Sequence, residues 1–152
     1  MNEKLQKYEK EMSLFREAVG DFEGHGTPSP STAQTLDKLG IKNYTVRSDG
    51  TVDVQGSVDL SHKRLTKLPV QFGTVSGSFW CYGNRLTSLA GCPKTVGGSF
   101  ECSGNRLTSL AGCPETVHGG FWCGHNRLTS LAGSPAEVQG SFSCSGNRLT
   151  SL

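Results

Sequence analysis

The chain has 152 residues, of which 34% are apolar and 20 are glycine, and its formal net charge is only +2. Residues 1–51 carry seven Lys/Arg against eight Asp/Glu, and residues 52–152 carry eight against five. This balance excludes the strongly basic surface of a non-specific DNA-binding protein. No stretch approaches the roughly 18 apolar residues of a membrane span, and the first twenty residues lack the apolar run of a secretory signal. We therefore expect a cytoplasmic protein without membrane contact.

Residues 3–19 show the apolar spacing of an amphipathic helix. The residues that share one face are Leu5, Tyr8, Met12, Phe15 and Val19. Such a helix can pack on the end of a neighbouring domain as a cap. The alternative is a helix for dimerisation or for a partner, although two heptads are too short for an independent coiled coil.

A second, shorter helix is predicted from about Pro30 to Leu39, with Ser29 or Ser31 as its N-cap and Gly40 as its stop. Residues 44–54 then alternate apolar and polar on both sides of an Asp-Gly pair, which is typical of a β-hairpin. The hairpin would cover the open edge of whatever follows it. Residues 1–51 are accordingly expected to form an N-terminal cap made of two helices and a hairpin.

From residue 52 the chain repeats with a period of 21 residues. The sequence Asn-Arg-Leu-Thr-Ser-Leu begins at Asn84, Asn105, Asn126 and Asn147. Other columns hold valine (54, 75, 96, 117, 138), glycine (56, 77, 98, 119, 140), phenylalanine (79, 100, 121, 142) and cysteine (81, 102, 123, 144). A fixed period of this length predicts a solenoid, in which each coil buries its apolar residues against its neighbours. We expect the Val, Phe and Cys columns to point inward within each strand, and the asparagines to satisfy backbone groups of adjacent coils.

The core of each unit, such as Phe79-x-Cys81-x-x-Asn84-x-Leu86-x-x-Leu89, resembles the leucine-rich repeat. The repeat length of 21 residues and the Leu68-Pro69 dipeptide are similar to the short bacterial type of leucine-rich repeat. The amino-acid sequence as a whole resembles small repeat proteins of tailed bacteriophages. The resemblance implies an α/β solenoid: a right-handed arc with a parallel sheet on its concave side. It implies no catalytic residue, because this scaffold serves many binding functions. A phage protein of this kind would act in the host cytoplasm.

Residues 52–152 then comprise about four and a half units without a polar C-terminal cap. We expect either that the repeat continues beyond this sequence or that the open edge is covered by a partner or by a second copy. Homo-oligomers could therefore form through this C-terminal edge or through the N-terminal helix.

The six cysteines fall in two repeat columns, where other units place Leu60, Gln71 and Ser134. A position that also accepts leucine uses cysteine for its volume, as a buried free thiol. A straight column does not supply the four converging ligands of a zinc site. The four histidines are scattered along the chain, and no catalytic triad, carboxylate pair or phosphate-binding glycine motif is present. We expect no enzyme activity, no metal and no cofactor.

The strand positions that should face outward differ from unit to unit. They hold Trp80, Tyr82, Glu101, Trp122 and His125. Exposed Trp and Tyr are favoured anchors of protein interfaces, so these residues are our candidate partner-binding patch on the concave face. The alternative is that the tryptophans pack against each other or against the cap.

A second conspicuous column is basic, with one arginine per unit: Arg64, Arg85, Arg106, Arg127 and Arg148. Like charges at this spacing repel unless they spread into solvent or meet anions. The ordinary interpretation is a solvated rim whose aliphatic stems cover neighbouring leucines. The alternative is a row that binds an acidic partner or phosphates. Taken together, the sequence favours a non-enzymatic protein-binding scaffold, with an anion or nucleic-acid binder and a self-assembling structural protein as the alternatives.

Overall fold

A computed structural model describes residues 31–150 of the chain. The amphipathic helix predicted over residues 3–19 lies outside this range, as does the last leucine. The chain divides into two compact units between Gly40 and Ile41. Each unit is described separately below.

In the first unit, helix α2 spans Thr32–Lys38. The Ser31 hydroxyl accepts a hydrogen bond from the Gln34 backbone N–H at 3.1 Å, and the Gln34 side chain accepts one from the Ser31 N–H at 3.1 Å. This reciprocal capping box satisfies two N–H groups that a helix start leaves unpaired. Gly40 follows with φ of 75°, the left-handed conformation common after a helix. The predicted short helix is confirmed, while its role as a cap stays a prediction.

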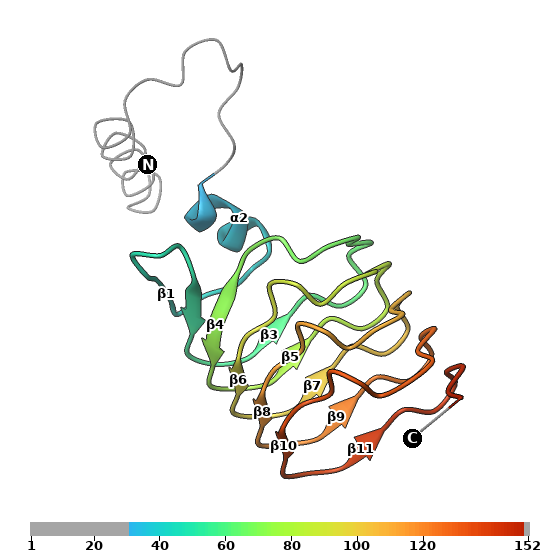
Figure 1. Ribbon diagram of the computed structural model, residues 1–152. Helices are drawn as coiled ribbons and strands as arrows, with labels where there is room; N and C mark the ends of the chain where they lie inside the picture. Colours follow the sequence, from blue (N-terminus) through green and yellow to red (C-terminus); the bar gives the residue numbers. More distant parts are fainter. Residues whose placement is uncertain (1–30, 151–152) are drawn as a thin grey trace, which may run out of the picture. The chain divides into compact units, whose positions relative to one another are not determined.

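The second unit is a β-solenoid of short strands (Figure 1). One parallel sheet, which we call sheet A, contains β2 (Val52–Val54), β4 (Phe72–Val75), β6 (Thr95–Val96), β8 (Thr116–Val117) and β10 (Glu137–Val138), and β1 (Tyr44–Val46) joins it at one edge. The other, sheet B, contains β3 (Val58–Asp59), β5 (Phe79–Trp80), β7 (Phe100–Glu101), β9 (Phe121–Trp122) and β11 (Phe142–Ser143). Each coil therefore contributes one strand to each sheet.

The strands stack with the period of the sequence. Val75 pairs with Val96 in sheet A, and Phe79 pairs with Phe100 in sheet B, each 21 residues further along the chain. The predicted repeat solenoid is confirmed. The expectation of one strand per unit is wrong, because the Val and Phe columns belong to different sheets. The described part of each coil is strand and turn, with no helix between repeats, so the α/β class with a single concave sheet is not confirmed.

The glycine column lies at the corner between the two strands of a coil. A Cβ atom on Gly119 would lie 2.8 Å from the backbone carbon of Gly98, and one on Gly140 would lie 2.7 Å from that of Gly119. Real Cβ atoms essentially never approach other atoms so closely. The glycines therefore let successive coils stack in contact at the corner.

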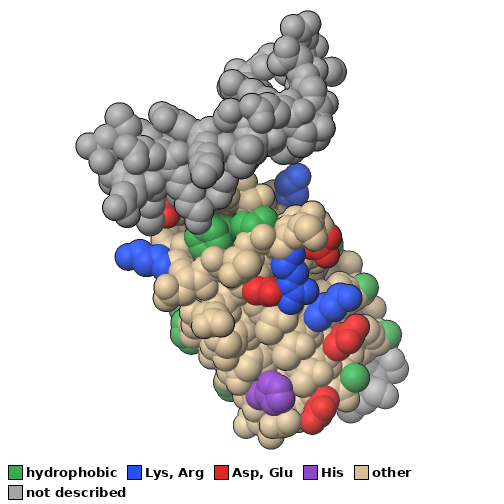
Figure 2. Space-filling model, turned by 90° about the vertical axis from the view of Figure 1, so that its left-hand side faces the viewer, with side chains coloured by type: hydrophobic (Ala, Val, Ile, Leu, Met, Phe, Trp, Pro, Cys, Tyr) green, Lys and Arg blue, Asp and Glu red, His purple; other side chains and the backbone are tan. Residues whose placement is uncertain are grey.

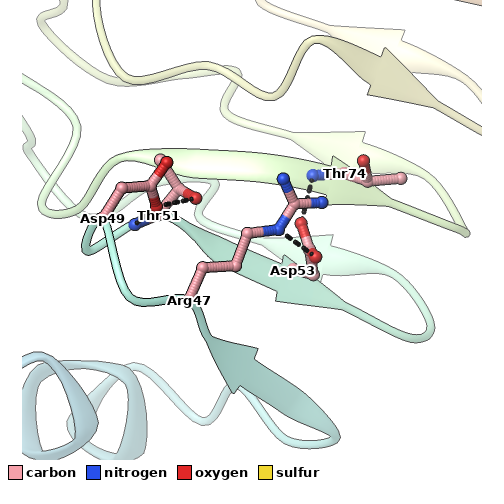
Figure 3. Close-up of polar contacts among 5 residues, drawn as sticks. All are labelled: Arg47, Asp49, Thr51, Asp53 and Thr74. Atoms are coloured by element: carbon pink, nitrogen blue, oxygen red, sulfur yellow. Dashed lines mark hydrogen bonds and ion pairs between the residues drawn. The ribbon is translucent and has the colours of Figure 1, made fainter.

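The predicted hairpin is confirmed: β1 pairs antiparallel with β2, and Arg47, Asp49 and Gly50 lie in or beside its turn. Figure 3 shows how the hairpin is connected by hydrogen bonds to β4, the next strand of sheet A. Asp53 accepts hydrogen bonds from the Arg47 Nε at 2.6 Å and from the Thr74 backbone N–H at 2.8 Å. The Asp53 carboxylate thus joins three consecutive segments at the edge of sheet A.

The core is a column of like residues. The valines and cysteines of the middle coils are buried, and Phe79, Phe100 and Phe121 are fully buried. The rings of Phe79 and Phe100 stack at 5.6 Å, and those of Phe100 and Phe121 at 5.4 Å. In the last coil, Phe142 stacks on Phe121 at 5.1 Å but remains 40% exposed. Inward Val, Phe and Cys are as predicted.

The asparagines form a second internal column. Asn105 accepts a hydrogen bond from the Leu86 N–H of the preceding coil at 3.0 Å, and it donates to the carbonyl oxygens of Cys81 and Cys102, both at 3.0 Å. Asn126 repeats this pattern one coil later. Each asparagine side chain thus links two coils, because it hydrogen-bonds to backbone groups that the turn would otherwise leave unpaired. Their predicted structural role is confirmed.

Candidate functional site

The outward positions of sheet B bring most of the predicted patch together. Trp80 pairs with Glu101, and Glu101 pairs with Trp122, so these three residues occupy adjacent positions across β5, β7 and β9. The column continues to Asp59 on β3 and to Ser143 on β11. All three central side chains are half-buried. Because parallel strands lie roughly 4.8 Å apart, the two tryptophans stand roughly 10 Å apart with Glu101 between them.

Trp122 is directed along its own coil. The outer edge of its benzene ring occupies the space where a Cβ atom of residue 120 would be, within 2.6 Å of that position. The other coils place Ser78, Ser99 and Ser141 at this position, and only this coil has a glycine there. Gly120 thus makes room for the Trp122 indole. Within residues 31–150, no ring contact joins the two tryptophans, so the alternative that they pack against each other is not supported.

Tyr82 lies two positions after Trp80 and is also half-buried. Its ring meets the His62 imidazole edge to face, with the centroids 5.1 Å apart. A Cβ atom on Gly83 would collide with the same imidazole. His62 and Tyr82 therefore extend the aromatic surface at the strand ends of the first two coils.

His125 is exposed and has φ of 52°, in the left-handed region. The same position in other coils is held by His62, with φ of 53°, and by Gly83, Gly104 and Gly146, with φ of 69°, 67° and 69°. A residue with a Cβ atom is strained by about 1 kcal/mol or more in this conformation. The coil of Trp122 thus carries a histidine, as the first coil does, at a position where three other coils have glycine, and strained side chains of this kind concentrate at functional positions.

The acidic groups of this face are Glu101 and Asp59. The Asp59 carboxylate accepts hydrogen bonds from the Ser61 backbone N–H at 3.0 Å and from the Ser61 hydroxyl at 2.5 Å. These bonds hold the pKa of Asp59 below its ordinary value. Among the residues that the structure describes, the one ion pair is Arg47–Asp53, whose carboxylate lies on β2 of sheet A. Glu101 therefore has no cationic partner within the described range.

The arginine column is a separate feature of the same unit. Its backbone is in register, because the Arg85 N–H donates to the Leu65 carbonyl at 2.8 Å and the Arg106 N–H donates to the Leu86 carbonyl at 2.9 Å. All five side chains are exposed: Arg64, Arg85, Arg106, Arg127 and Arg148. None of them forms an ion pair with another described residue. The column is thus a row of free positive charge.

The cysteines are free thiols, and most of them are buried. All six are free, and Cys81, Cys92, Cys102 and Cys123 are buried. Burial raises the pKa of Cys113 and of Cys123 to about 12, and raises that of Cys102 well above its ordinary value. A thiol with so high a pKa is a poor nucleophile and a poor metal ligand at neutral pH. Across residues 31–150, no three His, Cys, Asp or Glu side chains are grouped to hold a metal ion.

The outward face of sheet A is chemically different. Its paired positions hold Thr74, Thr95, Thr116 and Glu137. Figure 2 views the solenoid from this side, and most of the surface is tan, from backbone and small polar side chains, with charged side chains of both signs among them. The aromatic residues of the predicted patch are confined to sheet B.

The prediction from the repeat named the candidate patch but not three residues that the structure places beside it: Asp59, His62 and Gly120. Asp59 and His62 lie in a unit that departs from the repeat, and only the register of sheet B places them beside Trp80 and Tyr82. Gly120 was visible in the sequence as a glycine in a column of serines, but its meaning depends on where the Trp122 ring lies.

Comparison with models of protein families, with curated proteins and with solved structures found no match to this chain. No helix in the described range is long and apolar enough to cross a membrane. The site must therefore be interpreted from its own chemistry.

Proposed function

We propose that this protein is a non-enzymatic scaffold that binds another protein through the outward face of sheet B. The contact residues are Trp80, Tyr82, Glu101, Trp122 and His125. The observation that carries the proposal is that two half-buried tryptophans, Trp80 and Trp122, share one outward column of sheet B, with Tyr82 two positions after the first, whereas the corresponding column of sheet A holds threonines and a glutamate. Partly exposed tryptophan and tyrosine contribute large contact areas at low entropic cost, and they are enriched among the residues that dominate binding energy.

Two further observations support a binding role. Gly120 departs from the serine of the other coils and accommodates the Trp122 ring. In the same coil, His125 occupies a left-handed position that is glycine in three other coils and histidine in the first. Both departures disturb an otherwise regular repeat without adding to its core. They are therefore better explained by the surface that they create than by folding.

The kinship of the chain, its origin and the source of its partner are part of the same proposal. We retain the kinship with short leucine-rich repeats, which the Asn and Leu positions support, and the origin in a tailed bacteriophage. The partner would then be a host protein in the cytoplasm, which the phage protein engages or inhibits. Self-association through the edge of the solenoid or through the N-terminal helix is the competing structural role, and light scattering over a range of concentrations tests it.

The test compares capture of proteins from host extract by the wild-type chain and by the variant in which Trp80 and Trp122 are both replaced by alanine. Loss of a specific captured protein, with unchanged circular dichroism, supports the proposal. A matched control replaces the sheet A residues Thr95 and Thr116 by alanine. Capture that survives loss of both tryptophans would refute the role of this face.

The arginine column favours a second function, the binding of an acidic partner or of phosphate groups. Its support is a row of five exposed guanidinium groups without ion pairs in the described range. Binding through such a row weakens steeply as salt rises. Salt-dependent retention on heparin that is lost when Arg106 and Arg127 become glutamine would support this function, and absence of retention would exclude it.

A further inference from the structure

The central column of sheet B has a pattern that specifies the chemistry of its partner. An acidic side chain, Glu101, lies between two tryptophans, Trp80 and Trp122, at directly paired strand positions. Asp59 adds a second carboxylate on the far side of Trp80. From this alternation we propose that the face binds an arginine side chain of a partner protein, seated over Glu101 between the two indoles. This inference rests on the proposed function.

The spacing suits a cation. A group centred over Glu101 is one strand spacing, roughly 5 Å, from the strand of each tryptophan. Cation–π attraction acts over roughly 6 Å from a ring centroid and is strongest for tryptophan. The same position brings the cation to a carboxylate that has no cationic partner among residues 31–150. One bound charge would therefore satisfy three side chains together.

The lie of Trp122 keeps the place over Glu101 accessible. Its ring extends toward Gly120, along its own coil, and no ring contact ties it to Trp80 within the described residues. A glycine at position 120 is what permits this arrangement, because a Cβ atom there would displace the ring. Glu101 itself is half-buried, so part of it remains exposed.

Arginine fits this column better than lysine. Its guanidinium is planar, so it can stack on an indole while its N–H groups form two parallel hydrogen bonds to a carboxylate. It is also less strongly hydrated than an ammonium group, so it loses less on leaving water for a half-buried aromatic surface. The His125 and Tyr82 side chains flank the column and would contact the backbone on either side of the bound arginine.

The experiment uses the two indole N–H signals of the 15N-labelled full-length protein, since the chain contains two tryptophans and both lie in the proposed site. Replacing each tryptophan by phenylalanine assigns the signals. The probe is the peptide acetyl-Gly-Ser-Arg-Ser-Gly-amide, compared with peptides carrying lysine or the neutral isostere citrulline instead of arginine. We expect both signals to shift saturably with the arginine peptide, at least fivefold weaker binding of the lysine peptide, and no saturable shift with citrulline.

The matched variants are Glu101→Gln and, on sheet A, Glu137→Gln. Loss of the charge at position 101 should weaken binding of the arginine peptide by about tenfold, since charge-assisted hydrogen bonds are roughly twice as strong as neutral ones. The change at position 137 should leave this binding unchanged. Equal binding of citrulline, equal binding of lysine, or unchanged affinity in Glu101→Gln would each overturn the inference. Self-association of the wild-type chain that Glu101→Gln abolishes would also overturn it, by making a second copy the occupant.

The same variants separate this inference from the proposed function. If removal of both tryptophans abolishes capture of a host protein but Glu101→Gln and excess arginine peptide leave capture intact, the face binds a protein and the arginine inference alone fails. If removal of the tryptophans leaves capture intact, the proposed function fails as well.

Discussion

Replacement of Asn105 by alanine tests the internal column of asparagines. The Asn105 side chain is 8% exposed and accepts a hydrogen bond from the fully buried Leu86, through its N–H, at 3.0 Å. It also donates to the carbonyl oxygens of Cys81 and Cys102, both at 3.0 Å. We expect the Asn105→Ala variant to fold with a much lower free energy of unfolding.

The magnitude follows from which groups lose their last partner. The Cys81 carbonyl keeps the Asn84 amide as a donor at 3.0 Å, and the Cys102 carbonyl keeps that of Asn126 at 3.1 Å. The Leu86 N–H has no such replacement and would be left buried and unpaired, which costs about 1–3 kcal/mol. With about 1 kcal/mol for the net value of the lost donor bonds, the expected destabilisation is about 3 kcal/mol.

Asn147 provides the matched control. It makes equivalent bonds, to the Leu128 N–H at 3.0 Å and to the Cys144 carbonyl at 2.9 Å, but it is only half-buried. Water can replace the lost amide there, so Asn147→Ala should cost about 1 kcal/mol. Urea unfolding followed by circular dichroism and by tryptophan emission measures both values. Equal losses in the two variants, or a loss below about 1 kcal/mol in Asn105→Ala, would refute the reasoning.

Three further outcomes follow. Gly119→Ala should destabilise the fold by about 2 kcal/mol, because its Cβ atom would meet the Gly98 backbone at 2.8 Å; a urea midpoint equal to that of the wild type would contradict the corner packing. Gly120→Ser should displace the Trp122 ring and red-shift its emission without lowering stability by more than about 0.5 kcal/mol, and an unchanged spectrum would show that the ring does not lie there. Burial and raised pKa values should also protect Cys81, Cys92 and Cys102 from a disulfide reagent at pH 8 until the protein unfolds. Rapid labelling of any of these three thiols in the native protein would contradict this prediction.

The repeat made much of this fold predictable. Once the period of 21 residues is recognised, the partner of every strand residue follows, and Val75 with Val96 or Phe79 with Phe100 are pairs that the sequence alone specifies. The helix start at Ser31 and the hairpin around Gly50 were predictable for local reasons, since capping and turn formation depend on a few adjacent residues.

The division of each coil into two sheets was not predictable from these patterns. Most strands have two residues, such as Thr95–Val96 and Phe100–Glu101, which is too short for an alternating pattern to appear. The corner between them lies at glycines whose role depends on contacts with the neighbouring coil. Long-range stacking, rather than local propensity, decides where each strand ends.

The candidate site was predictable in its residues but not in its geometry. Variation between units identified Trp80 and Trp122 as outward residues, because framework positions repeat while surface positions differ. That Glu101 stands between them, and that Asp59 continues the column, required the register of sheet B. The sequence pattern therefore indicated a surface, and the pairing of strands gave that surface its chemistry.

The most direct test of the central claim is the binding footprint of the captured partner on the 15N-labelled protein. Our account predicts that chemical-shift changes concentrate at β5, β7 and β9, with both indole N–H signals among the most affected. Signals of Thr95 and Thr116 on the other sheet should not change. A footprint on the threonine face or along the arginine column, with the two indole signals unmoved, would contradict it.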